Sequence, residues 1–187
     1  NAATQFDAFS HGAGMLWVGW FGFNGGSALA ANGDAGMAML ATHISAAAAA
    51  FTWMMAEQHK YGKPSVLGAI TGMVAGLGTI TPASGFVGPG GALVIGISAG
   101  IVCFVATGYL KRSLKIDDSL DVFPVHSVGG LLGTLMTAVF ASNVLGGFSC
   151  QEEIDIGSQF TAQLVGVMAV FIYTGLLTFI ILKIVGA

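Results

Sequence analysis

The sequence predicts an all-α membrane protein, a polytopic bundle of six transmembrane helices. Of its 187 residues, 55% are hydrophobic and only 8% are charged, and the mean hydropathy is +0.82. Soluble domains average about 25% charged residues, so this composition is typical of a chain embedded in a lipid bilayer. Six apolar runs are each long enough to cross about 30 Å of hydrocarbon as a helix. The 29 glycines fit this class, because membrane helices use small residues to approach one another closely.

Residues 1–187 are treated as a single transmembrane domain whose spans are separated by polar or glycine-containing segments. The predicted spans are 13–31, 35–56, 65–83, 90–110, 121–147 and 159–184. Two of the connections are very short, so consecutive helices are expected to run antiparallel. In the third span, Gly68, Gly72 and Gly76 recur every four residues, which predicts close helix packing and indicates no substrate.

The basic residues predict the orientation of the chain. When the connections alternate between the two sides of the membrane, all six fall on one side: Lys60, Lys63, Lys111, Arg112, Lys115 and Lys183. By the positive-inside rule that side is cytoplasmic, and both termini lie there. The opposite side has the acidic segment 150–155, which is consistent with this orientation. We therefore expect a multi-pass protein of the cell membrane.

Composition gives no indication of a metal, a cofactor or a nucleic-acid partner. The net charge of −3 is too small to imply a nucleic acid. Cys103 lies in an apolar run and Cys150 in a polar connection, so a disulfide between them is not expected. A zinc site would need more ligands at tighter spacing.

The first span carries side chains that suit the path of a small cation. Phe23 and Ser27 are four residues apart and share one helix face, with Ser27 about 6 Å further out. A hydroxyl beyond an aromatic ring can receive a cation and pass it over the π face. Asn24 belongs to the same candidate pathway, because an amide in hydrocarbon needs a partner or a cavity. In the alternative interpretation, Trp17 and Trp20 are interfacial belt residues, Phe23 faces lipid and Ser27 bonds its own backbone.

His126 lies inside the fifth span, and an ionisable side chain in hydrocarbon indicates a functional site. Asp121 is the expected N-cap of this helix, and Pro124 is tolerated in its first turn. The positive end of the helix dipole favours a neutral imidazole, which can accept a proton on one nitrogen and donate from the other. Alternatively, His126 is a buried residue that hydrogen-bonds a neighbouring helix.

Five stretches, in order along nearly the whole chain, resemble the Amt branch of the ammonium transporter (Amt/Mep/Rh) family. They are 20–28 (WFGFNGGSA), 62–65 (GKPS), 81–86 (TPASGF), 90–92 (GGA) and 117–130 (DDSLDVFPVHSVGG). The resemblance implies that the chain corresponds to the second half plus the final helix of an eleven-helix inverted-repeat transporter. The first half of that fold is then expected from the same or another chain.

The resemblance also implies roles for individual residues. Phe23 would be one of two stacked phenylalanines that gate the outer mouth of a pore, and Ser27 would recruit ammonium there. Val122 would line the pore, and His126 would be one of a pair of central histidines. Asp121 would support the pore structurally. The family is expected to form homotrimers in which each subunit has its own channel.

The function that follows is ammonium transport with no enzymatic step. NH4+ is recruited at an outer vestibule and loses its proton, and NH3 and H+ then cross along the histidines. One alternative is an ammonium sensor, and another is a haem-binding electron-transfer protein with His43 and His126 as ligands. An intramembrane serine protease is disfavoured, because no glycine follows Ser27.

Overall fold

The computed structural model describes residues 2–148 and 154–186. Six long helices follow one another: α1 (Ala2–Gly26), α2 (Gly33–Tyr61), α3 (Val66–Ile80), α4 (Pro89–Tyr109), α5 (Gly129–Phe140) and α6 (Ile156–Val185). Three short helical segments accompany them: the π-helical η1 (Leu110–Leu114) and η2 (Phe123–Val128), and the 3-10 turn η3 (Asn143–Leu145). Within the described ranges no β-strand occurs, so the predicted all-α class is confirmed.

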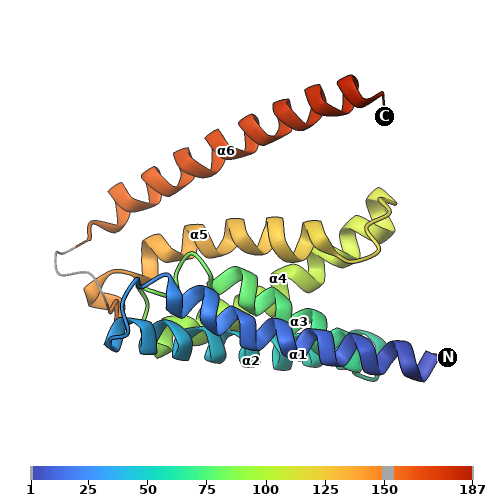
Figure 1. Ribbon diagram of the computed structural model, residues 1–187, viewed down its shortest axis with the longest axis horizontal. Helices are drawn as coiled ribbons and strands as arrows, with labels where there is room; N and C mark the ends of the chain where they lie inside the picture. The colour runs from blue at the N-terminus through green and yellow to red at the C-terminus, as the bar shows by residue number, and fades with distance from the viewer. Residues whose placement is uncertain (1, 149–153, 187) are drawn as a thin grey trace.

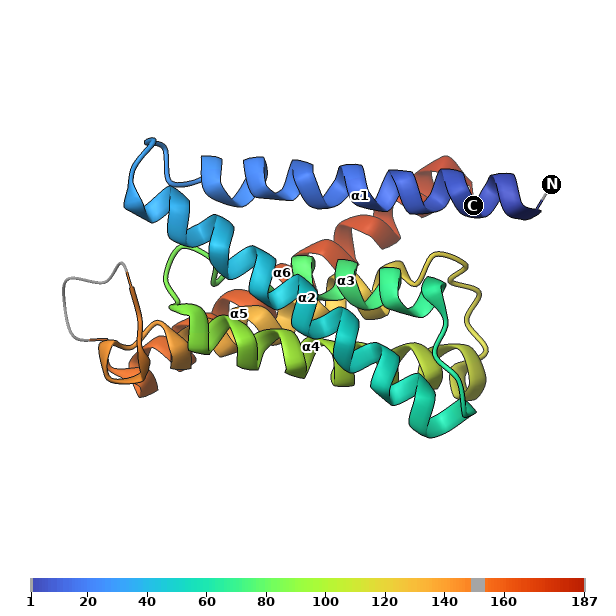
Figure 2. The same cartoon turned by 90° about the horizontal axis from the view of Figure 1, so that it is seen from below.

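The helices run up and down through one elongated bundle (Figures 1 and 2). The α2–α3 and α4–α5 connections lie at the same end as the start of α1 and the end of α6 (Figure 2). The basic residues belong to this end: Lys60 and Lys183 lie in the last turns of α2 and α6, and Lys111 and Arg112 lie in η1. The antiparallel helices therefore bring these basic residues to the same end of the bundle, as the sequence predicted.

Four helices of the described chain are long and apolar enough to cross a membrane. They are Gly33–Tyr61, Pro89–Leu114, Phe123–Phe140 and Ile156–Val185. The helix α3 is apolar but shorter, with 15 residues. This pattern identifies a multi-pass membrane protein.

The bounds of α1 and α5 differ most from the predicted spans. The first helix begins at Ala2 instead of 13, because its first half is helical but too polar to be marked by hydropathy. The fifth stops at Phe140 instead of 147, because the chain beyond it bonds elsewhere. There Phe148 N donates to Phe86 O at 2.9 Å, and Gly88 N donates to Gly146 O at 3.0 Å.

Glycine contacts hold α2, α3 and α4 together. A Cβ built on Gly76 of α3 would lie 2.5 Å from the carbonyl oxygen of Ser45 in α2, and one built on Gly96 of α4 would lie equally close to it. A Cβ on Gly100 would lie 2.8 Å from Ala49 O. No real side chain fits at such distances, so the absence of Cβ atoms allows the three backbones to touch. The predicted packing role of the glycine ladder is confirmed.

By contrast, α6 stands apart from the bundle. It contacts α5 but has no buried residue, and it leans away from the other helices (Figure 1). Its mean hydropathy of 2.4 is the highest of the candidate spans. The helix therefore presents an apolar surface over its whole length.

Candidate functional site

The ring of Trp20 lies between Phe23 and His126 and contacts both of them. Its ring stacks on His126, with centroids 6.4 Å apart and planes at 15°, and it meets Phe23 edge-on at 6.3 Å. The indole Nε1 donates a hydrogen bond to Thr81 Oγ1 at 2.8 Å, which anchors the ring beyond the end of α3. The structure thus forms an aromatic row of Phe23, Trp20 and His126 from α1 and η2. In the sequence analysis, Trp20 was a belt residue in the alternative interpretation and the first residue of a stretch that resembles the family, and no role in the pathway was assigned to it.

His126 projects from the π-helical turn η2 and its side chain is exposed. The two residues before it, Pro124 and Val125, are buried and fix the turn against the bundle. Gly78 of α3 lies beside this turn, since a Cβ there would be at ordinary contact distance, 3.8 Å, from His126 Nδ1. π-Helical turns inside α-helices occur frequently at functional sites, because they re-aim side chains.

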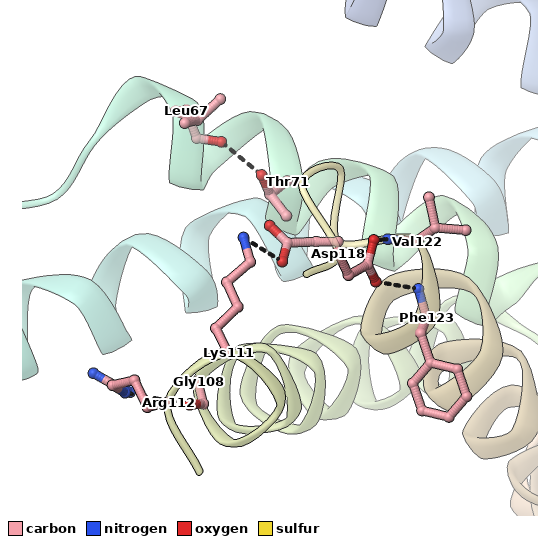
Figure 3. A network of polar contacts seen from close by, with 9 residues as sticks. Leu67, Thr71, Gly108, Lys111, Arg112, Asp118, Val122 and Phe123 are labelled. Carbon is pink, nitrogen blue, oxygen red and sulfur yellow. Dashed lines mark hydrogen bonds and ion pairs between the residues drawn. The ribbon is translucent and has the colours of Figure 1, made fainter. Parts of the chain in front are cut away.

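The start of the histidine helix is capped by Asp118, three residues before the Asp121 that the sequence indicated. The two oxygens of the Asp118 carboxylate accept from Val122 N at 3.0 Å and Phe123 N at 2.8 Å (Figure 3). Asp121 has a left-handed backbone, with φ 55°, and its Oδ1 pairs with Lys111 Nζ at 2.7 Å. The expectation that the Asp121 side chain caps this helix is therefore corrected. Asp121 instead ties the helix start to η1.

Ser27 and Asn24 occupy different surroundings. Ser27 follows the last turn of α1, is exposed, and donates from Oγ to Phe23 O at 2.7 Å. Asn24 is buried between α1 and α2, where its Nδ2 donates to Thr42 Oγ1 at 2.9 Å. The partner that an amide in hydrocarbon requires is thus Thr42. Ser27 is exposed and bonded to the backbone of Phe23, as the alternative interpretation expected, whereas Asn24 is buried.

An open apolar pocket of about 540 Å³ runs beside the aromatic row along α1. Its lining consists of Gly12, Met15, Leu16, Gly19, Trp20 and Phe23. Phe23 is 62% exposed and Val122 is 50% exposed. The pathway candidates Phe23, Val122 and His126 therefore present uncovered faces.

The remaining histidines and cysteines have separate environments. His43 packs on Trp17 at 5.2 Å and on Phe21 at 5.9 Å, so its aromatic neighbours differ from those of His126. Cys103 is a free, buried core residue. Cys150, with most of the acidic segment around it, lies outside the described residues. In the described part of the chain no cluster of three or more His, Cys, Asp or Glu residues is arranged to hold a metal ion.

Comparison with known proteins gives consistent matches. The model of the Ammonium Transporter Family matches residues 7–187. The ammonium transporter Amt1 of Archaeoglobus fulgidus is 45% identical over 178 residues, which are 94% of this chain and 44% of that protein. The crystal structure of Saccharomyces cerevisiae Mep2 has a TM-score of 0.83 and 38% identity, covering 93% of this chain and 43% of that one. A solved Sensor Amt Protein has a TM-score of 0.82 and 35% identity, with the same coverage. The chain thus spans less than half the length of these relatives.

Proposed function

Since this chain belongs to the ammonium transporter family, we propose that it forms one side of a transmembrane pathway for ammonium. The observation that supports this most is the aromatic row, which runs from Phe23 through Trp20 to His126. The row has π faces at one end, where the hydroxyl of Ser27 bonds to Phe23 O, and an imidazole at the other end. These are the chemical groups that a pathway for a small, deprotonatable cation requires.

Recruitment is assigned to the end of α1. The Ser27 oxygen can accept a hydrogen bond from NH4+, and the rings of Phe23 and Trp20 offer π faces that attract a desolvated cation. Phe23 then acts as the gate, since its exposed ring stands next to Trp20 at the entrance to the row. Asn24 contributes indirectly, because its bond to Thr42 fixes α1 on α2.

The pathway selects ammonium over K+ and Na+ because only ammonium can release a proton. Moving a bare cation into a low-dielectric passage forfeits its hydration, which costs several kcal/mol even after relaxation. Ammonium avoids part of this cost by releasing H+, whereas K+ and Na+ have no proton to release. The imidazole of His126 has nitrogens that can accept and pass on that proton, while NH3 crosses along the apolar wall that includes Val122. Asp121, held by Lys111, supports the start of this helix.

The uncovered faces of the row and of the pocket beside it suit closure by the other part of the fold. We propose that the missing half supplies the second histidine and the opposite wall, and that the whole protein is a homotrimer with one pore per subunit. The basic end of the bundle is assigned to the cytoplasm and the α1–α2 connection to the outside of the cell membrane. Ammonium therefore enters from the Ser27 side.

The test is ammonium-driven current in proteoliposomes that contain the complete transporter. A pulse of ammonium should produce a current or a luminal pH change that saturates with concentration, and an equal pulse of K+ should produce neither. Absence of any ammonium-driven response in correctly folded protein would contradict the proposal.

Sensing is a second candidate, because the Sensor Amt Protein has nearly the same structural similarity to this chain as Mep2 has. Saturable ammonium binding without current would favour it. A Soret band in the purified protein would instead favour the haem alternative with His43 and His126 as ligands.

A further inference from the structure

The short turn η1 bonds to two different parts of the bundle through two adjacent basic side chains. Lys111 pairs with Asp121, with Nζ and Oδ1 2.7 Å apart. Arg112 donates from Nη1 to Tyr61 Oη at 3.0 Å and from Nε to Gly108 O at 3.2 Å. Figure 3 shows the Lys111 and Arg112 side chains leaving η1 in different directions. The turn therefore connects the end of α2, where Tyr61 is the last residue, to the start of the histidine helix.

The carboxylate of Asp121 depends on Lys111 for compensation of its charge. Its Oδ1 is buried, and no hydrogen-bond donor reaches this atom among the described residues. In the same part of the chain, Lys111 is the only cation within ion-pair distance of Asp121. The Asp121 side chain is 17% exposed and that of Lys111 is 42% exposed, so the pair is partly withdrawn from water. Since a poorly solvated carboxylate without a counter-charge is destabilised, loss of Lys111 should drive the Asp121 side chain out toward water.

Asp121 in turn affects the position of η2. Its backbone is left-handed, with φ 55°, a conformation that few residues other than glycine adopt. Its carbonyl oxygen accepts a hydrogen bond from Val125 N at 3.1 Å, and Val125 is buried directly before His126. Because η2 has only six residues, a change in the Asp121 backbone would be passed on to the imidazole. We therefore expect the stacking of His126 on Trp20, at 6.4 Å, to depend on the conformation of Asp121.

The Asp118 cap does not make this contact redundant. Its carboxylate binds the first two amides of the histidine helix. Pro124 has no N–H group, so the next donor along the chain is Val125 N, and its partner is the Asp121 carbonyl. Asp118 and Asp121 thus hold successive parts of the same helix start.

We propose that Lys111 is a positioning residue for ammonium transport, which acts on His126 only through Asp121. The ion pair holds Asp121 in the left-handed conformation that directs the imidazole toward Trp20. Arg112 anchors η1 on α2, so that Lys111 stays within reach of the carboxylate. This inference rests on the proposed function of His126 and adds the residue that fixes its geometry. Loss of the ion pair should leave the imidazole present but misplaced.

The first measurement reads this geometry without transport. The complete transporter is labelled with fluorotryptophan, and the fluorine NMR signal of Trp20 is identified by its absence in Trp20→Phe. Lys111→Met should shift this signal, because the imidazole stacked on the indole moves. Lys111→Arg keeps the charge and should give the wild-type signal. An unshifted Trp20 signal in folded Lys111→Met protein would overturn the proposal.

The second measurement is ammonium-driven current in proteoliposomes of the complete transporter. Lys111→Met should lower it by about tenfold, within the range of up to about 100-fold that misplacement of a reacting group costs. Lys111→Arg should recover most of the current. Lys115→Met is the matched control, because Lys115 follows the same turn, is exposed and forms no ion pair in the described chain, and it should conduct as wild type does. Equal losses for Lys111→Met and Lys115→Met would show a general effect of charge and overturn the proposal.

Asp121→Ala keeps the test valid if Lys111→Met fails to fold. It removes the same ion pair from the other side and leaves no uncompensated carboxylate, so it should shift the Trp20 signal and lower the current. Adding Lys111→Met to Asp121→Ala should change neither readout further, because both substitutions remove one interaction. Additive losses in the double variant would overturn the proposal.

The two proposals fail separately. Absence of any ammonium-driven current in the wild-type protein contradicts the proposed pathway. An unshifted Trp20 signal in Lys111→Met contradicts the positioning role of Lys111, whether or not the protein conducts.

Discussion

The contact region of α2, α3 and α4 and the aromatic row are built in opposite ways. In the first, glycines such as Gly76 and Gly96 remove side chains so that backbones touch and nothing fits between them. In the second, the large rings of Phe23, Trp20 and His126 stand partly exposed, and within the described chain a single side-chain hydrogen bond, from Trp20 to Thr81, holds them. The packed region fixes the frame, and the row leaves ring faces uncovered, as the proposed ammonium pathway requires. Changes in the frame should reduce stability, and changes in the row should reduce transport.

The largest effect is expected from Gly76→Val. The added side chain would overlap Ser45 O and Ala49, neither of which can move without separating α2 from α3. We expect the free energy of unfolding to fall by about 3 kcal/mol or more, because overpacking a tight contact forces the backbones apart. Thermal unfolding of the detergent-solubilised protein measures it. Gly36→Ala in α2 is the control, since nothing lies within 4 Å of its Cβ position, and it should unfold as wild type does. Equal stability of the two variants would break the comparison.

Asp118→Ala should have the next largest effect on stability. It removes both acceptors for Val122 N and Phe123 N at the start of the histidine helix. Loss of such a cap costs about 2 kcal/mol at the upper end of the usual range. Asp117→Ala removes the same charge from an exposed neighbouring residue and should cost little. Chemical denaturation of both variants decides whether the cap or the charge matters.

Trp20→Phe should lower transport more than stability. The ring remains, but the hydrogen bond to Thr81 Oγ1 is lost, which costs about 1 kcal/mol. Without that anchor the ring is free to leave the row, so the ammonium current should fall. Thr81→Val removes the same bond from the other side and should lower the current similarly. If both variants conduct normally, the row does not depend on this anchor.

The smallest effect concerns the start of α6, far from both regions. Hydrogen bonds from the Ser158 side chain and backbone lower the pKa of the Asp155 carboxyl below its ordinary value. A lowered pKa means that the charged cap stabilises the helix start above about pH 3.9 and is lost as pH falls through the lower folded-state pKa. Amide-exchange protection at Ser158 should therefore be constant from about pH 7 to 5 and decrease below about pH 4. Asp155→Asn should show no such pH dependence.

Much of the fold could be predicted, because hydropathy, charge and glycine spacing are local patterns. They indicated six helices, their alternation, the single basic end and the packing of α3. The bounds of α1 and α5 differed, since a polar helical turn and a backbone pairing such as Phe148 with Phe86 leave no apolar signal.

The site was predicted less completely, for reasons that lie in tertiary contacts. Phe23 and His126 were indicated by residue type, by their places in the predicted spans and by the family resemblance. The central place of Trp20 depends on the approach of η2 to α1, a tertiary contact that the sequence does not display. Asp118 caps the histidine helix in place of Asp121, because Asp121 has a left-handed backbone and forms an ion pair with Lys111. The sequence displays neither feature. The adjacent acidic pair Asp117 and Asp118 was the one available signal.

We propose that His126 handles the proton of ammonium, and the variant His126→Ala is the sharpest test of this role. The measurement is the ratio of ammonium-driven to K+-driven current in proteoliposomes of the complete transporter, with His43→Ala as the matched control. We expect His126→Ala to abolish the ammonium current or to let K+ pass, and His43→Ala to keep the wild-type ratio. Unaltered current and selectivity in folded His126→Ala protein would contradict it.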